Sequence, residues 1–164
     1  MCSSIALKAV VMEDFCNYKK PSMFLVTAIC DWKCCVEAKI DKSVCQNHGL
    51  VTQATKKYTY QSLYKGFISN NITKAIVVGG LEPFLQFDEL FGLIKFFRSQ
   101  RCNATFVIYT GYNHIEIKEQ IKQLTTLSNI IIKFGRYIPN DTGYYNNILG
   151  IKLASKNQYA EVIC

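Results

Sequence analysis

The sequence contains no apolar run of about 18 residues, the length that a helix needs to cross a bilayer. Its first residues also lack the basic segment, apolar core and small-residue cleavage site of a secretory signal. Repeats, low-complexity tracts and linkers are absent, and there are only three prolines in 164 residues. We therefore expect a single cytoplasmic domain over residues 1–164, with no membrane partner.

Acidic residues are scarce: 12 carboxylates stand against 19 lysines and arginines, which gives a net charge of +7. A basic balance favours anionic partners such as nucleotide phosphates, nucleic acid or an acidic protein surface. The lysines are spread along the chain, however, and Lys19-Lys20 and Lys56-Lys57 are only pairs. A solvated basic surface is the better interpretation, and we do not expect nucleic acid as a partner.

Apolar patterning predicts strands that alternate with helices along most of the chain. The predicted strands are residues 5–11, 23–28, 75–78, 105–109 and 130–133, and the predicted helices are residues 60–68, 87–97 and 115–124. This alternation indicates an α/β fold with a mainly parallel sheet and right-handed crossovers. Loops at the carboxyl ends of such strands share one edge, so Cys30, Gly79-Gly80 and Thr110-Gly111 should cluster there.

Four of the eight cysteines fall between residues 30 and 47, in a long polar loop over residues 29–55. Reduced thiols clustered in a cytosolic chain indicate metal or redox chemistry. Cys30 and Cys34 have three residues between them, and Cys34 and Cys45 have ten. These spacings favour an iron–sulfur cluster, while a zinc site completed by His48 and the absence of any metal stay open. Adjacent residues seldom point at one site, so either Cys34 or Cys35 is expected as the second ligand.

Two turns that follow predicted strands carry further candidates. Gly79 and Gly80 let a ligand approach the backbone closely, and Glu82 adds an acceptor for an ammonium group. An ordinary strand-to-helix turn explains the two glycines about as well. Tyr109, Thr110, Gly111 and Tyr112 form a similar turn, whose aromatic rings either flank a base or pack.

Taken together, these stretches resemble the radical S-adenosylmethionine (SAM) family, and within it the activating proteins of anaerobic ribonucleotide reductase. The resemblance covers most of the chain and rests on the shared order of several motifs. The motifs are Asp14-Phe15-x-Asn17, Cys30-x3-Cys34, Cys45-Gln46-Asn47, Gly79-Gly80-x-Glu82-Pro83, Tyr109-Thr110-Gly111-Tyr112, Phe134-Gly135-Arg136 and Ser155-Lys156-Asn157-Gln158.

The resemblance implies a partial (β/α) barrel that binds a 4Fe–4S cluster and SAM. It implies cluster ligands Cys30, Cys34 and Cys45, with Cys35 as the alternate to Cys34. The SAM-binding residues that it implies are Gly79, Gly80, Glu82, Tyr109, Thr110 and Asn157. One electron from the cluster would cleave SAM, and the 5′-deoxyadenosyl radical would take a hydrogen atom from a glycine of a partner. The implied partners are a glycyl radical enzyme, such as anaerobic ribonucleotide reductase, and an electron donor, such as flavodoxin or ferredoxin.

The chain departs from this family at the last cysteine. The family has two residues between its second and third cysteines, whereas ten separate Cys34 from Cys45 here. An insertion of this length can still close on a metal, because closure entropy grows slowly with loop length. Two alternatives follow: a zinc-binding module on the same cysteines with His48 that contacts nucleic acid through Lys56-Lys57-Tyr58, or a degenerate radical SAM protein that cleaves nothing.

Overall fold

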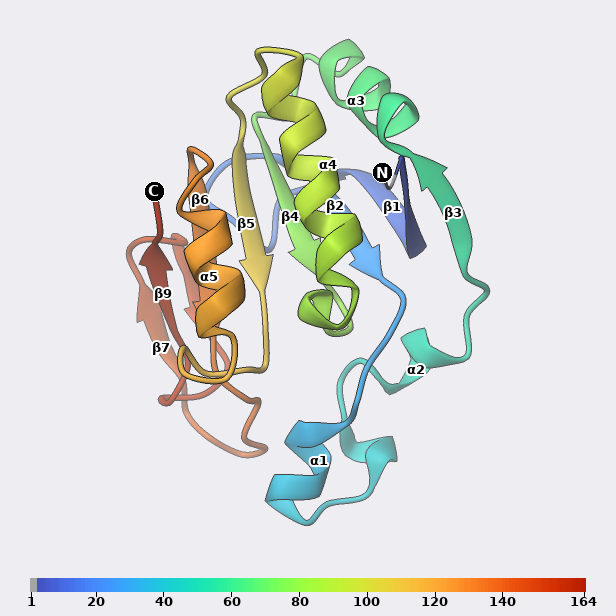
Figure 1. Ribbon diagram of the computed structural model, residues 1–164. Helices are drawn as coiled ribbons and strands as arrows, with labels where there is room; N and C mark the ends of the chain where they lie inside the picture. The colour runs from blue at the N-terminus through green and yellow to red at the C-terminus, as the bar shows by residue number, and fades with distance from the viewer. Residues whose placement is uncertain (1–2) are drawn as a thin grey trace.

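The computed structural model describes residues 3–164, which form a seven-stranded mixed sheet with helices packed on one face (Figure 1). The strand order is β3-β1-β2-β4-β5-β6-β9. The bounds are β1 (Ser4–Asp14), β2 (Ser22–Thr27), β3 (Lys56–Thr59), β4 (Ala75–Gly79), β5 (Thr105–Tyr109), β6 (Ile130–Phe134) and β9 (Tyr159–Val162). Strands β2, β4, β5 and β6 pair in parallel, while β1, β3 and β9 are antiparallel to their neighbours.

The central strands form because their sequences are short, apolar and rich in β-branched residues. All five residues of β4 and all five of β6 are buried, as expected for strands covered on both faces. Helices α3 (Tyr60–Ser69), α4 (Phe87–Ser99) and α5 (Lys118–Leu124) cover one face of the sheet (Figure 1). The buried apolar residues form two cores, one on each face of the sheet. The hairpin of β7 (Tyr144–Asn146) and β8 (Ile151–Leu153) contributes to the smaller core, on the face opposite the helices.

Helix α4 shows how the apolar pattern produces the larger core. Phe87, Leu90, Ile94 and Phe97 recur at helical spacing and are almost fully buried against the sheet. Asp88 and Glu89 in the first turn and Arg98 in the last turn match the helix dipole.

The parallel strands point their carboxyl ends at one edge of the sheet, and the loop that follows β2 lies beyond that edge (Figure 1). This loop was predicted as a polar stretch with little regular structure. It contains three short helical segments instead: α1 (Lys33–Ala38), η1 (Lys42–Val44) and α2 (His48–Val51). A further short helix, η2 (Pro83–Gln86), follows β4. The long loop is therefore locally ordered by backbone hydrogen bonds, although its apolar periodicity is weak.

The structure confirms the prediction of a mixed α/β fold with a parallel centre. The finer prediction of a partial barrel stays a prediction, because the described sheet is open, with β3 and β9 as its edges. The helix predicted over residues 115–124 begins later, at Lys118. Asn113 Oδ1 accepts from the backbone N–H groups of Ile115 and Glu116, so these residues form a capped turn before the helix.

The helices in residues 3–164 are short compared with the thickness of a bilayer. None of them is both long enough and apolar enough to span one.

Candidate functional site

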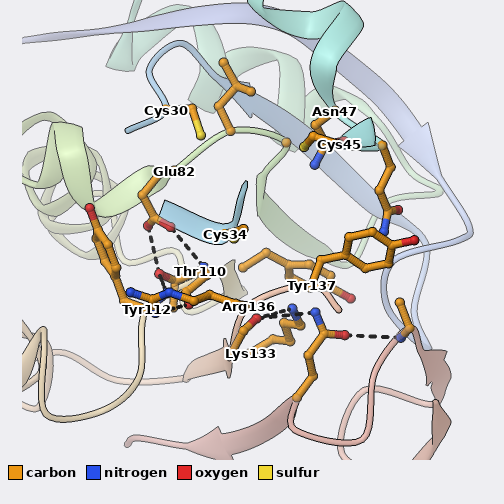
Figure 2. A pocket seen from close by; sticks show the side chains of 18 of the residues that line it. Cys30, Cys34, Cys45, Asn47, Glu82, Thr110, Tyr112, Lys133, Arg136 and Tyr137 are labelled. Carbon is orange, nitrogen blue, oxygen red and sulfur yellow. Dashed lines mark hydrogen bonds between the residues drawn. The ribbon is translucent and has the colours of Figure 1, made fainter. Parts of the chain in front are cut away.

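A pocket of about 430 Å³ lies where the loop after β2 folds over the carboxyl ends of the parallel strands (Figure 2). This volume is within the usual range for small-molecule sites. The residues singled out from the sequence that line it include Cys30, Cys34, Cys35, Cys45, Gly80, Glu82, Tyr109 and Thr110. The expected meeting of three distant segments at one sheet edge is therefore confirmed.

The four loop cysteines reach the pocket from three short pieces of chain. Cys30 lies three residues after the end of β2, Cys34 and Cys35 lie in α1, and Cys45 caps the end of η1. Trp32 precedes α1 with a positive φ of 61°, which is rare for a bulky side chain and turns the chain sharply between Cys30 and Cys34. The ten residues between Cys34 and Cys45 thus form most of α1 and all of η1, and they bring Cys45 back to the pocket.

Cys34 and Cys35 both line the pocket, although we expected adjacent residues to diverge. Cys34 is half-buried, and a Cβ added to Gly111 would lie only 3.1 Å from its Sγ atom. Cys35 is 3% exposed, and its thiol is hydrogen-bonded to Cys45. Adjacent helical residues differ by about 100° around the axis, so both can face a pocket that wraps the helix end.

Burial dominates the electrostatics of these thiols. It raises the pKa of Cys30 to about 11, against a hydrogen bond that Cys30 Sγ accepts from the Trp32 N–H at 3.4 Å. Burial also raises the pKa of Cys34, but the Tyr137 N–H and the charge of Arg136 oppose this shift. Burial raises the pKa of Cys35, and the neighbouring Cys45, Cys34 and Asp41 raise it further. Without metal Cys30, Cys34 and Cys35 are therefore protonated thiols, so metal binding to any of them must release a proton.

Glu82 ties the turn after β4 to the turn after β5. Its side chain is 6% exposed, and burial raises its pKa to about 7. Oε1 accepts hydrogen bonds from the Thr110 hydroxyl at 2.8 Å and the Phe84 N–H at 3.1 Å. Oε2 accepts from the Gly111 N–H at 2.9 Å. The carboxylate was predicted only as a ligand contact, and the structure shows that it also fixes the site's backbone (Figure 2).

The two glycines after β4 have different surroundings. Gly80 lines the pocket with a positive φ of 89°, and a Cβ there would lie 2.6 Å from Val26 Cγ1. Gly79 is the last residue of β4 and is not among the lining residues; a Cβ on it would lie 2.9 Å from Tyr109 Cβ. Gly79 therefore permits close packing of neighbouring strands, and its predicted contact with a ligand stays a prediction.

The remaining predicted SAM-binding residues are also split by position. Tyr109 lines the pocket, and its hydroxyl donates to the Asn17 carbonyl at 2.5 Å. Thr110 is 2% exposed and is engaged with Glu82. Asn157 is exposed, donates to the Arg136 carbonyl at 2.9 Å and does not line the pocket, whereas its neighbour Gln158 does.

The structure does not favour the alternative zinc site. His48 is exposed, packs its ring 5.9 Å from that of Trp32 and does not line the pocket. Across residues 3–164, no three His, Cys, Asp or Glu side chains are placed to hold a single metal ion. Thiolates that share an iron–sulfur cluster bind different iron atoms and need not converge on one point.

A polar network that the sequence did not reveal fastens the cysteine loop to the sheet edge. The Tyr112 hydroxyl donates to Asp31 Oδ2 at 2.6 Å. Arg136 forms a bidentate pair with Glu116 at 2.6 and 2.7 Å, and its Nε lies 2.6 Å from Glu37 Oε2 in α1, poorly aligned for a hydrogen bond. In the sequence, the only indication that Arg136 has a role at the site is its position in the Phe134-Gly135-Arg136 motif.

The donor set fits an iron–sulfur cluster. Four cysteine sulfurs line one pocket, and thiolates are the usual ligands of such clusters. Cys30, Cys34 and Cys45 lie close enough together that a thiolate at Cys45 raises the pKa of both Cys30 and Cys34.

Comparison with known families supports the same chemistry. Residues 22–158 match the family described as a 4Fe-4S single cluster domain. The matched span covers most of the chain, so the protein belongs to this family and is an iron–sulfur protein. The match supports a 4Fe–4S cluster as its metal group. No curated protein is significantly similar to the chain.

Proposed function

We propose that this protein is a SAM-dependent radical enzyme that activates a glycyl radical enzyme, such as anaerobic ribonucleotide reductase. The observation that carries the proposal is the shared pocket of the cysteine loop, the Gly80–Glu82 turn and the Thr110–Gly111 turn. Family membership supports the cluster, and the motif resemblance extends the proposal to SAM, to a radical-SAM-like partial barrel and to the partner.

Three of the four pocket cysteines would bind the cluster and leave one iron open. We assign Cys30, Cys34 and Cys45 to this role. Cys34 is preferred over Cys35 because the Tyr137 N–H and Arg136 stabilise a thiolate at Cys34, whereas the neighbours of Cys35 destabilise one. When bound, the cluster supplies one electron for cleavage of the SAM sulfonium into methionine and a 5′-deoxyadenosyl radical.

Glu82 would hold the amino group of SAM. An ionised carboxylate accepts about four hydrogen bonds, and Glu82 accepts three from the protein. One acceptor position is therefore left for an ammonium group, whose charge would favour the ionised carboxylate. Gly80 keeps the adjacent backbone free of a side chain, so that a ligand can approach it.

Pocket size and charge support the proposed partners. The pocket of about 430 Å³ has the size of one small-molecule site, so a protein glycine presented to it from outside is a suitable substrate. The net charge of +7 suits an acidic electron donor such as flavodoxin or ferredoxin.

The test is anaerobic. The protein is reconstituted with iron and sulfide, reduced and given SAM, and 5′-deoxyadenosine is measured for the wild type, Cys45→Ala and the control Cys164→Ala. Cys164 is exposed and lies outside the pocket. Product from the wild type and the control but not from Cys45→Ala supports the proposal. A bound cluster without product, even when the partner is present, contradicts it and indicates a protein that has lost cleavage activity.

A further inference from the structure

Strand β6 contains a buried lysine, Lys133. Its sequence is Ile-Ile-Ile-Lys-Phe, and all five residues are buried. Lys133, the fourth of them, is 8% exposed. A lysine is almost never buried without a partner, because removing an ammonium group from water is costly.

Contacts within the protein do not compensate Lys133. Its Nζ donates one hydrogen bond, to the Gly135 carbonyl at 3.2 Å, and lies 5.8 Å from the centre of the Tyr109 ring. Among residues 3–164, no carboxylate lies within ion-pairing distance of Nζ. Burial accordingly lowers the pKa of Lys133 to about 8. An ammonium group has three donors, so two of them are available to a ligand.

The side chain of Lys133 belongs to the pocket. Lys133 lines it together with Cys34 and Glu82, and the charges of both residues influence its pKa. Figure 2 shows Lys133 on the pocket wall below Cys34 in that view. Glu82 and Lys133 therefore present opposite charges to one cavity without pairing with each other. A ligand that carries both an ammonium and a carboxylate group is complementary to such a cavity.

We propose that Lys133 binds the carboxylate of the amino-acid end of SAM, while Glu82 binds its ammonium group. The inference rests on the proposed function and makes Lys133 a specificity residue for a zwitterionic ligand. A ligand that lacks the carboxylate would leave the buried ammonium uncompensated, so the site discriminates against it.

The test is equilibrium binding, measured by calorimetry on the reconstituted protein under anaerobic conditions. Two ligands are compared: SAM and its decarboxylated analogue, which keeps the amino group and the sulfonium. Lys133→Met should weaken SAM binding about 10- to 100-fold, the usual effect of losing a charge-assisted hydrogen bond. It should change the binding of the analogue less than about threefold. Lys118→Met is the matched control, because Lys118 is exposed on α5, outside the pocket.

Folding is checked on the same samples. Lys133→Met should unfold at the same or a higher temperature than the wild type, since the substitution removes an unpaired buried charge. Lys133→Gln is a second variant that keeps a polar side chain, and it should show the same discrimination.

Three results would overturn the assignment. Equal weakening of both ligands by Lys133→Met and Lys133→Gln indicates a merely structural role, and unchanged SAM binding shows that Lys133 does not contact the carboxylate. A wild type that holds its cluster but binds neither ligand refutes the proposed function, and the Lys133 assignment with it.

Discussion

The Oε1 atom of Glu82 lies 2.8 Å from the hydroxyl of Thr110, and both side chains are almost fully buried. Glu82 follows β4 and Thr110 follows β5, so this hydrogen bond joins the turns of neighbouring parallel strands. Thr110 Oγ1 also accepts from the Tyr112 N–H at 3.0 Å, and the Tyr112 hydroxyl reaches Asp31. One chain of polar contacts thereby connects both turns to the cysteine loop.

Glu82→Gln should flatten the dependence of unfolding free energy on pH between about pH 5 and 7. Burial raises the pKa of Glu82 from 4.5 to about 7, so the folded state keeps a proton that the unfolded state releases. Wild-type stability therefore declines as pH rises through this window, by at most about 3 kcal/mol. Urea unfolding of the metal-free protein from about pH 5 to 8 measures the difference.

Glu119→Gln, which changes an exposed glutamate of α5, is the control for this experiment and should follow the wild-type curve. If the unfolding free energy of Glu82→Gln has the same pH dependence as that of the wild type, the pKa of Glu82 is not raised in the folded protein.

Gly80→Ala should lower the free energy of unfolding by about 1–3 kcal/mol. Gly80 has a positive φ, and the new Cβ would lie 2.6 Å from Val26 Cγ1 in β2. Gly49→Ala is a matched control in α2, where a Cβ meets nothing within 4 Å and alanine favours the helix. Thermal unfolding of both variants checks this, and a Gly80→Ala variant as stable as Gly49→Ala would show that the turn tolerates a side chain.

Arg136→Met should destabilise the protein by about 1–3 kcal/mol, because it removes the bidentate partner of the Glu116 carboxylate and the side chain that donates to the Gly111 carbonyl. Glu37→Gln should cost less than about 1 kcal/mol, since the Glu37 side chain is 57% exposed and its ion pair is screened by water. Chemical denaturation distinguishes the two. Equal losses would mean that the α1 contact, rather than the Glu116 pair, is the main role of Arg136.

Cys34→Ala should abolish most iron binding, whereas Cys35→Ala should retain about four iron atoms per chain. The reason is the thiolate environment: Tyr137 N–H and Arg136 favour an anion at Cys34, while Cys45, Cys34 and Asp41 disfavour one at Cys35. Iron and sulfide analysis after anaerobic reconstitution gives the answer. Retention in Cys34→Ala with loss in Cys35→Ala would reverse the ligand assignment.

The centre of the fold could be predicted from the sequence because buried strands and amphipathic helices have strong patterns. Strands β4 and β5 and helix α4 were predicted nearly to the residue. The edge strand β3 and the β7–β8 hairpin were missed for physical reasons. Strand β3 (Lys56–Thr59) is polar and mostly exposed, and the three-residue strands of the hairpin are too short to show alternation.

The pocket was predictable only to the level of the sheet edge. Parallel-strand geometry placed Cys30, Gly80 and Thr110 together, because the carboxyl ends of such strands meet. Lys133 was missed because a lysine at the end of an apolar run is normally taken as exposed. Its burial depends on side chains that are distant in sequence, such as Tyr109, which no local pattern reveals.

Three loop cysteines are proposed to hold a 4Fe–4S cluster with one iron open to SAM. Electron paramagnetic resonance of the reduced, reconstituted protein with and without SAM tests this arrangement. We expect a reduced-cluster signal that SAM shifts, and loss of that signal in Cys45→Ala but not in Cys164→Ala. A cluster signal that SAM leaves unchanged, or one that survives Cys45→Ala, would contradict it.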